Sequence, residues 1–330
     1  MSPTTPTTFD RPTPRRPRTG RRIVTLALAA TLAAGVATLA SSVEASALSG
    51  TNYSFSTLNS SDDPTFNQLL GINDQQVIAG YFGSGASGTP NKGYTIDPPY
   101  GQSNYYNENF PGSVQTQVTA INDFGNTAGF WANAAGANFG FVEQGGSFST
   151  VTDPKTTSKP AVNQILGRNN ANETVGFYND AKGHSHAYEY NVNTKKFVAL
   201  TPPGAVSAMA TGINDEGDVV GTLTTAKGAT EGFLLKGVTY TDFEIDGSGQ
   251  TSVFGVNDIL QIVGSYTDSS GVQHGFVQNT SGVVYSVDDP NGVGSTVVNG
   301  INNGGTLVGF YTDTAGNTDG FVATPTSYAG

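Results

Sequence analysis

One short sequence recurs six times along this chain of 330 residues, and its spacing constrains the fold more than any other feature. The clearest copy, residues 211–221, reads TGINDEGDVVG. Every copy contains an Asn that a Gly follows seven positions later, and the gaps between successive Asn residues are 43 to 49. The six Asn residues are Asn73, Asn122, Asn169, Asn214, Asn257 and Asn302. A phase that holds over six copies marks a repeat array.

Each repeat predicts four short β-strands. The first strand ends at the Asn, as in residues 208–213, and a tight turn follows because Asn and Asp accept backbone N–H groups while Gly allows a positive φ. Residues 219–223 and 232–235 are the next two strands, and a fourth carries an aromatic residue, as in 285–290. Four strands in 40–50 residues predict the blades of a β-propeller, with the strand before the Asn innermost. A β-helix or a sandwich is disfavoured, since β-helix coils are usually shorter and sandwiches do not repeat in phase.

A small residue followed by an aromatic one stands 18 or 20 positions after each Asn. The pairs are Gly93-Tyr94, Gly140-Phe141, Ala187-Tyr188, Gly232-Phe233, Gly275-Phe276 and Gly320-Phe321. We expect the small residue to let neighbouring sheets approach and the ring to fill the gap between blades.

The two ends of the array complement each other. The sixth repeat supplies three strands and then runs out near Thr324, whereas residues 53–58 form an isolated strand pattern before the first repeat. We therefore predict an all-β, six-bladed propeller of four-stranded blades whose last blade is closed by the N-terminal strand. Such closure removes open sheet edges, which otherwise invite aggregation.

The repeat resembles a family of bacterial extracellular repeat proteins named for a His-Ala-Phe motif, which is largely uncharacterised. The resemblance rests on the pattern Gly-Ile-Asn-Asp-x-Gly-x-Val-Val-Gly followed by His274-Gly275-Phe276, or by His186-Ala187-Tyr188 in the third repeat. The other repeats carry Lys92, Phe139, Glu231 and Asp319 at the position of the His. The resemblance covers nearly all of residues 50–324 and implies export and a propeller-like fold. It assigns no catalytic residue.

Residues 1–47 have the features of a cleaved export signal peptide. A cluster of five arginines precedes the uncharged apolar run 23–40, and Ala45-Ser46-Ala47 is a small-residue cleavage motif. The pair Arg21-Arg22 leaves both the general secretory and the twin-arginine routes open. An uncleaved membrane anchor is the alternative, although eighteen apolar residues are few for a span. We expect residues 48–330 to be one domain that is secreted or periplasmic.

The net charge of the chain restricts the classes of binding partner that we expect. Without residues 1–47 the chain keeps nine basic and 24 acidic side chains, a net charge of −15. Phosphate binding needs clustered Lys and Arg, so nucleic acid and anionic membranes are not expected partners. The acidity itself favours either solubility outside the cell or binding of a divalent cation or a cationic partner. The chain has no Cys, which excludes disulfides, thiolate metal sites and a Cys nucleophile.

The repeated Asn and Asp residues are interpreted as structural, because a residue needed in every blade is a turn or inter-blade hydrogen-bonding element. Function is expected where the repeat is broken. The third repeat carries Arg168 where the others have Ile or Val, and this is the only Arg after residue 22. A buried guanidinium must be paired or face water. Arg168 is therefore either a carboxylate- or sulfate-binding residue near the axis, or an inter-blade salt bridge or solvent-exposed side chain.

Histidines and aromatic residues complete the candidate ligand-binding set. His184 and His186 lie two apart on one face of a strand, and His274 occupies the position of His186 in the fifth repeat. They suit either a ligand site or hydrogen bonds to a neighbouring turn. Trp131 and Tyr178 hold equivalent positions after the second strand, as does Tyr311, with Tyr266 close by. Such rings could stack on sugars, with core packing as the alternative.

No metal site and no cofactor are assigned. The segments 246–250 and 288–292 place oxygens close together but lack full calcium-loop spacing, so calcium stays an open alternative. Residues 247–249 do not form the strand–turn–helix elbow of a hydrolase.

Three functional hypotheses follow. The first is a non-catalytic extracellular binding module, a monomer, whose ligand is a glycan or a cell-envelope component. The second is an extracellular polysaccharide lyase or hydrolase with its site at the propeller channel mouth. The third is a purely structural surface protein. A cluster of Arg, His, Tyr and carboxylate at the mouth would favour the enzyme, and a mouth lined by repeated residues would favour the module.

Overall fold

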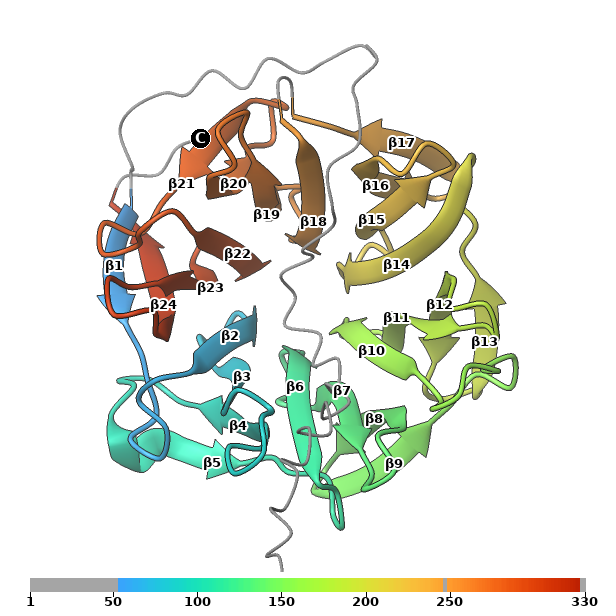
Figure 1. Ribbon diagram of the computed structural model, residues 1–330, viewed down its shortest axis with the longest axis horizontal. Helices are drawn as coiled ribbons and strands as arrows, with labels where there is room; N and C mark the ends of the chain where they lie inside the picture. Colours follow the sequence, from blue (N-terminus) through green and yellow to red (C-terminus); the bar gives the residue numbers. More distant parts are fainter. Residues whose placement is uncertain (1–52, 246–247, 327–330) are drawn as a thin grey trace, which may run out of the picture.

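A computed structural model of the chain describes residues 53–245 and 248–326, which form a ring of six four-stranded antiparallel sheets (Figure 1). The all-β, six-bladed propeller predicted from the repeats is thereby confirmed. The prediction of an export signal at residues 1–47 lies outside the described residues. Within the described ranges, no helix is long and apolar enough to cross a membrane.

In blades 1 to 3 the strands run outward from the axis in chain order. Blade 1 contains β2 (Asn67–Ile72), β3 (Ile78–Phe82), β4 (Lys92–Ile96) and β5 (Tyr105–Asn107), with the 3₁₀ turn η1 (Gln102–Asn104) before β5. Blade 2 contains β6 (Gln115–Ile121), β7 (Thr127–Ala132), β8 (Asn138–Gln144) and β9 (Ser147–Val151). Blade 3 contains β10 (Asn163–Arg168), β11 (Glu173–Asn179), β12 (Ser185–Asn191) and β13 (Lys196–Ala199).

Blades 4 and 5 follow the same order, and blade 6 takes its outer strand from the other end of the chain. Blade 4 contains β14 (Ala205–Ile213), β15 (Val219–Thr225), β16 (Thr230–Lys236) and β17 (Thr239–Phe243). Blade 5 contains β18 (Gln250–Val256), β19 (Ile262–Thr267), β20 (Gln273–Gln278) and β21 (Val284–Val287). Blade 6 contains β22 (Thr296–Ile301), β23 (Leu307–Thr312), β24 (Thr318–Pro325) and then β1 (Tyr53–Thr57).

The strand β1 is held to β24 by pairing and by side chains. Its register runs from Tyr53 opposite Pro325 to Thr57 opposite Phe321. Beyond the strand, the Asn59 amide donates to the Asp319 carboxylate at 2.6 Å and accepts from the backbone N–H of Gly320 at 3.0 Å. Residues about 260 positions apart therefore share one sheet edge.

Glycine at the seventh position after each Asn is explained by a bulge in the inner strand. Every inner strand shifts register just before its Asn, as between Ile165 and Gly167 in blade 3. The bulge brings the carbonyl oxygen of Gln164 so close to Gly176 that a Cβ there would collide with it. The same collision would occur in the other five blades, so only Gly fits beside the bulge.

The small residue before each aromatic ring lies where the next blade approaches. A Cβ on Gly140 would come within 3.0 Å of Ile165 in blade 3, and one on Gly320 within 3.0 Å of Leu69 in blade 1. The aromatic residues that follow are buried, with Phe141 and Phe321 fully so. The hydrophobic core consequently lies between blades, as apolar clusters that each draw on two neighbouring sheets.

Candidate functional site

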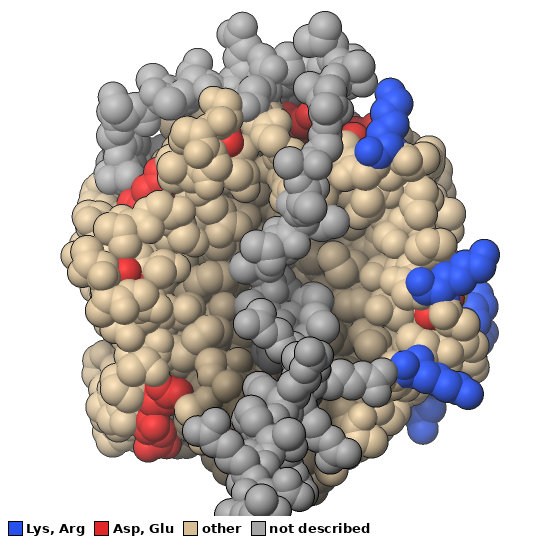
Figure 2. Space-filling model, in the orientation of Figure 1, with Lys and Arg blue, Asp and Glu red and all other residues tan. Residues whose placement is uncertain are grey.

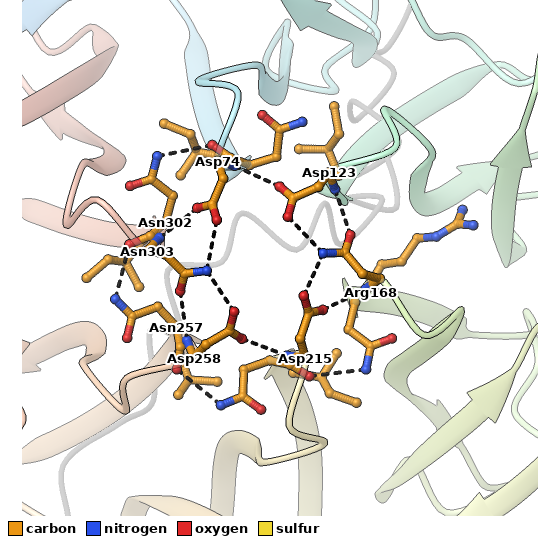
Figure 3. Close-up of a pocket in the computed structure, with 17 residues that line it drawn as sticks. Asp74, Asp123, Arg168, Asp215, Asn257, Asp258, Asn302 and Asn303 are labelled. Carbon is orange, nitrogen blue, oxygen red and sulfur yellow. Dashed lines mark hydrogen bonds between the residues drawn. The ribbon is translucent and has the colours of Figure 1, made fainter.

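The six repeated Asn residues form a closed ring of hydrogen bonds around the propeller axis (Figure 3). Each side-chain amide donates to the backbone carbonyl of the equivalent Asn in the next blade, at 3.0–3.2 Å. The bond from Asn302 to Asn73 joins the last blade to the first. The side-chain oxygen of each Asn accepts the N–H of the residue four positions later and so fixes the turn.

A second ring is made by the residue after each Asn. Its members are Asp74, Asp123, Asn170, Asp215, Asp258 and Asn303. Each backbone N–H donates to the side-chain oxygen of the equivalent residue in the next blade, at 2.7–3.0 Å. These are charge-assisted bonds wherever the acceptor is Asp.

Two of these six positions are Asn because the carboxylates need donors. Asn170 donates to Asp123 at 2.7 Å and to Asp215 at 2.5 Å. Asn303 donates to Asp74 at 2.8 Å and to Asp258 at 2.7 Å. An amide has two hydrogens, so one Asn bridges two neighbouring carboxylates. If all six positions were Asp, the second oxygen of each carboxylate would have no donor within the ring.

The two rings line a cavity of about 70 Å³ at the axial mouth. Pockets that bury a drug-sized ligand usually measure about 300–1,000 Å³, so this one has room for waters or an ion but not for a buried sugar ring. Its lining, taken over the described residues, contains no His, Tyr or Lys. The repeated Asn and Asp residues thus act as the inter-blade elements that the sequence predicted.

Arg168 begins beside this cavity, but its side chain points away from the axis (Figure 3). The guanidinium lies between blades 2 and 3, where one nitrogen donates to the carbonyls of Thr127 at 2.8 Å and Glu143 at 2.7 Å. Its other terminal nitrogen donates to Asn172 at 3.0 Å, and only 5% of the residue is exposed. Of the two interpretations of Arg168, the structure places it between blades rather than at the mouth.

The surroundings of Arg168 are polar where blade 4 is apolar. Thr127 and Glu143 occupy positions that hold Val219 and Leu235 in blade 4. Burial lowers the pKa of Arg168 to about 10, and the Glu143 carboxylate opposes that shift. Burial raises the pKa of Glu108 to about 7, with repulsion from Glu143 adding to the rise and a hydrogen bond from Thr127 opposing it.

Trp131 packs against two aromatic rings, Phe110 and Phe139. Phe110 lies parallel to it at a centroid distance of 4.6 Å, and Phe139 covers it at 4.9 Å. Two aromatic rings of the protein therefore pack against the indole. Among the two alternatives for Trp131, the structure places it in packing rather than in a free stacking position.

Tyr178 and His186 meet in blade 3 as a cross-strand pair on β11 and β12. Their rings stack at 5.1 Å, and the His186 Nε2 lies 3.1 Å from the Asp180 carboxylate. His184 Nδ1 approaches the same oxygen at 3.6 Å. The hydrogen bond with His186 lowers the pKa of Asp180 to about 2, with help from the backbone N–H groups of His184 and Lys182. We call these four residues the blade 3 cluster.

Blade 5 repeats this arrangement. Tyr266 and His274 are cross-strand partners on β19 and β20, and their rings also stack at 5.1 Å. His274 lies between two carboxylates, with Nδ1 at 2.9 Å from Asp288 and Nε2 at 3.5 Å from Asp268. Hydrogen bonds from Ser270 and Val272 lower the pKa of Asp268 to about 2. We call these four residues the blade 5 cluster.

The two clusters lie on partly exposed surface rather than in the axial cavity. The His186 and His274 side chains are 42% and 23% exposed. Throughout the described part of the chain, no group of three or more His, Asp or Glu residues is arranged to hold a metal ion. The structure thus brings together the candidates Tyr178 and His186, sets His274 in an equivalent cluster, and separates both from Arg168 and Trp131.

Sequence reasoning overlooked the carboxylates and the second ring amide. Asp180 and Asp268 both stand eleven positions after their repeated Asn, and Asn303 stands in the sixth repeat where Asn170 stands in the third. Comparing residues at the same distance from the repeated Asn in different repeats would have found them. The stacking of Tyr on His also follows from the hairpin register, which pairs the residues that stand nine and seventeen positions after the repeated Asn.

Comparison with known proteins identifies the fold class only. No family model and no curated protein matches the sequence. Among solved structures, TolB from Acinetobacter baumannii has a TM-score of 0.53 at 12% identity, covering 75% of this chain and 63% of its own. The SapL1 lectin in complex with alpha methyl fucoside gives 0.52 at 10% identity, covering 80% of this chain and 94% of its own.

A third similar structure is AofleA from Arthrobotrys oligospora, with a TM-score of 0.52 at 11% identity, covering 85% of this chain and 90% of its own. At such identities these likenesses establish a shared fold and nothing more, because one fold hosts many functions.

Proposed function

We propose that this chain is an exported repeat propeller of the His-Ala-Phe type that acts outside the cell as a non-catalytic binding module. Its ligand is a glycan or another component of the cell envelope. The binding surfaces are the blade 3 and blade 5 clusters, and the axial rings serve to close the propeller.

The duplication of the Tyr–His–Asp cluster carries this proposal. Tyr178 with His186 and Tyr266 with His274 stack at the same distance, on equivalent strands, beside a carboxylate in each case. A catalytic reaction needs one assembled constellation, whereas two equivalent surface sites suit a polymer that engages both and gains avidity. Partly exposed rings supply apolar contact, and the imidazole and carboxylate supply hydrogen-bonding groups for hydroxyls.

The alternative of a polysaccharide lyase or hydrolase at the channel mouth has less support. The axial carboxylates already accept hydrogen bonds from the ring, and the guanidinium of Arg168 lies between blades. The cavity of about 70 Å³ is small for a substrate. These contacts favour a structural role for the axial residues.

A glycan array and affinity electrophoresis against polysaccharides test the proposal on residues 48–330. We expect retardation by at least one polysaccharide, weakening in at least one of the variants Tyr178→Ala/His186→Ala and Tyr266→Ala/His274→Ala, and loss when all four changes are combined. The control is Asp313→Asn, which changes the carboxylate eleven positions after Asn302, where blade 6 has no His. Retention that survives all four changes in a folded protein, or release of oligosaccharides, would contradict the proposal.

A further inference from the structure

The two clusters differ in the charges around them. Lys155 and Lys159 lie in the loop between β9 and β10, and Lys182 lies in the loop between β11 and β12. All three side chains are exposed, and none of the three forms an ion pair within the described residues. They are therefore available to an anionic group on the surface of blade 3.

Backbone contacts bring these lysines to the blade 3 cluster. The N–H groups of Thr157 and Ser158, which lie between Lys155 and Lys159, both donate to the carbonyl of Asn179 at 3.2 Å. The next residue, Asp180, accepts the backbone N–H of Lys182 at 2.8 Å. The segments that carry all three lysines consequently meet at residues 179–180, beside His184 and His186.

The two carboxylates that are hydrogen-bonded to the lysine-bearing loops, Asp153 and Asp180, are occupied. Asp180 lies against both histidines, and Asp153 is buried with one oxygen bonded to the backbone N–H of Lys155. The three lysines therefore supply most of the exposed charge beside this cluster.

Blade 5 has the opposite environment. The chain contains no Lys or Arg after Lys236, so the segment that carries Asp268, His274 and Asp288 contributes no cation other than His. Figure 2 shows the visible Lys and Arg side chains gathered along the rim of blades 3 and 4, with some acidic atoms among them, whereas the other blades show only acidic side chains on this face. An anionic ligand would be repelled at blade 5 and attracted at blade 3.

We propose that the blade 3 cluster binds the acidic group of an anionic polysaccharide, whereas the blade 5 cluster binds only uncharged sugar. This inference rests on the proposed function, because it assigns a ligand class to each of the two surfaces. The shared chemistry at blade 3 is an exposed carboxylate, sulfate or phosphate held by Lys155, Lys159 and Lys182. Exposed ion pairs of this kind change affinity by roughly two- to five-fold each and weaken with salt.

The experiment measures binding of residues 48–330 to polygalacturonate, dextran sulfate and neutral galactan at 50 and 300 mM NaCl. The test variant is Lys159→Glu/Lys182→Glu. The matched control is Lys195→Glu/Lys196→Glu, which makes the same charge change at the end of the turn after β12 and the first residue of β13. We expect the test variant to lose about ten-fold or more in affinity for one of the two polyanions, and the control to lose less than about two-fold. Salt should weaken the wild-type complex, and Tyr266→Ala/His274→Ala should leave it unchanged.

Three results would overturn the inference. If the test and control variants lost equal affinity, the polyanion would be attracted by the charge of the whole surface rather than by the blade 3 cluster. Retention of double-stranded DNA equal to that of the polyanions would mean the same. Loss of polyanion binding in Tyr266→Ala/His274→Ala would place the acidic group at blade 5. Binding of galactan but of neither polyanion would refute this inference and leave the binding function standing, whereas binding of no polysaccharide would refute both. Preference for polygalacturonate or for dextran sulfate identifies carboxylate or sulfate as the recognised group.

Discussion

Asn170 and Asn303 lie in blades on opposite sides of the axis, and each donates both hydrogens of its side-chain amide to two Asp carboxylates. The order around the mouth is therefore two Asp and one Asn, repeated twice. This pattern supplies a donor to each of four carboxylates that would otherwise repel one another at close range.

The first prediction concerns this ring. Asn170→Asp removes the two bonds to Asp123 and Asp215 and sets a fifth carboxylate between them, so we expect a loss of about 2 kcal/mol in the free energy of unfolding. Urea denaturation at low ionic strength measures it, and 1 M NaCl should recover part of the loss because the ring is solvent-exposed. Asn193→Asp, an exposed change outside the ring, should cost less than about 0.5 kcal/mol. Equal stability of the two variants would remove the structural explanation for Asn170.

The second prediction concerns Arg168. Arg168→Ile restores the residue type of the other blades but leaves the Glu143 carboxylate without its neighbouring cation, so we expect a loss of about 3 kcal/mol. In Arg168→Ile/Glu143→Gln the uncompensated charge is gone while the acceptor for Gly146 remains, and at least half of the loss should be recovered. Chemical denaturation of the four proteins in a double-mutant cycle measures this coupling. An Arg168→Ile protein more stable than wild type would mean that the guanidinium is kept for a ligand.

The third prediction concerns closure by β1. Removal of residues 48–62 takes away the five register pairs with β24 and the contact of Phe55 with Phe321 at 5.5 Å. The melting temperature should fall by about 10 °C or more relative to a protein that starts at residue 48. A milder variant, Asn59→Ala, loses the bonds to Asp319 and Gly320 and should cost about 1–2 kcal/mol. Unchanged melting curves for both variants would refute closure by this strand.

The fourth prediction concerns pH. Burial raises the pKa of Glu108 from 4.5 to about 7, so between these values the folded protein holds a proton that the unfolded chain has released. The contribution of this group to stability is fully present below about pH 4.5 and is lost as pH rises to about 7. In Glu108→Gln this decline should be absent, which urea denaturation at several pH values between 4.5 and 8 can establish. A parallel pH dependence in the two proteins would show that Glu108 is not its source.

The repeats predicted the propeller because bulges, turns and inter-blade gaps impose fixed residue types at fixed spacing. Gly176 and Phe141 are such residues, and their roles follow from local geometry that every blade shares. The direction of Arg168 could not be predicted, since a residue beside the axis can turn inward or between blades with no change in spacing. The stacking of Phe110 on Trp131 likewise depends on a neighbouring segment outside the repeat pattern.

Binding without catalysis at two equivalent clusters can be examined in a single experiment that follows binding and cleavage together. Residues 48–330 are incubated with each polysaccharide that retards them in affinity electrophoresis, and retention and released oligosaccharides are followed together. We predict retention with no released product, weakening in at least one of the two variants that change Tyr178 with His186 or Tyr266 with His274 to Ala, and loss when all four residues are changed. Release of oligosaccharides by the wild-type protein, or full retention by the fourfold variant, would contradict this prediction.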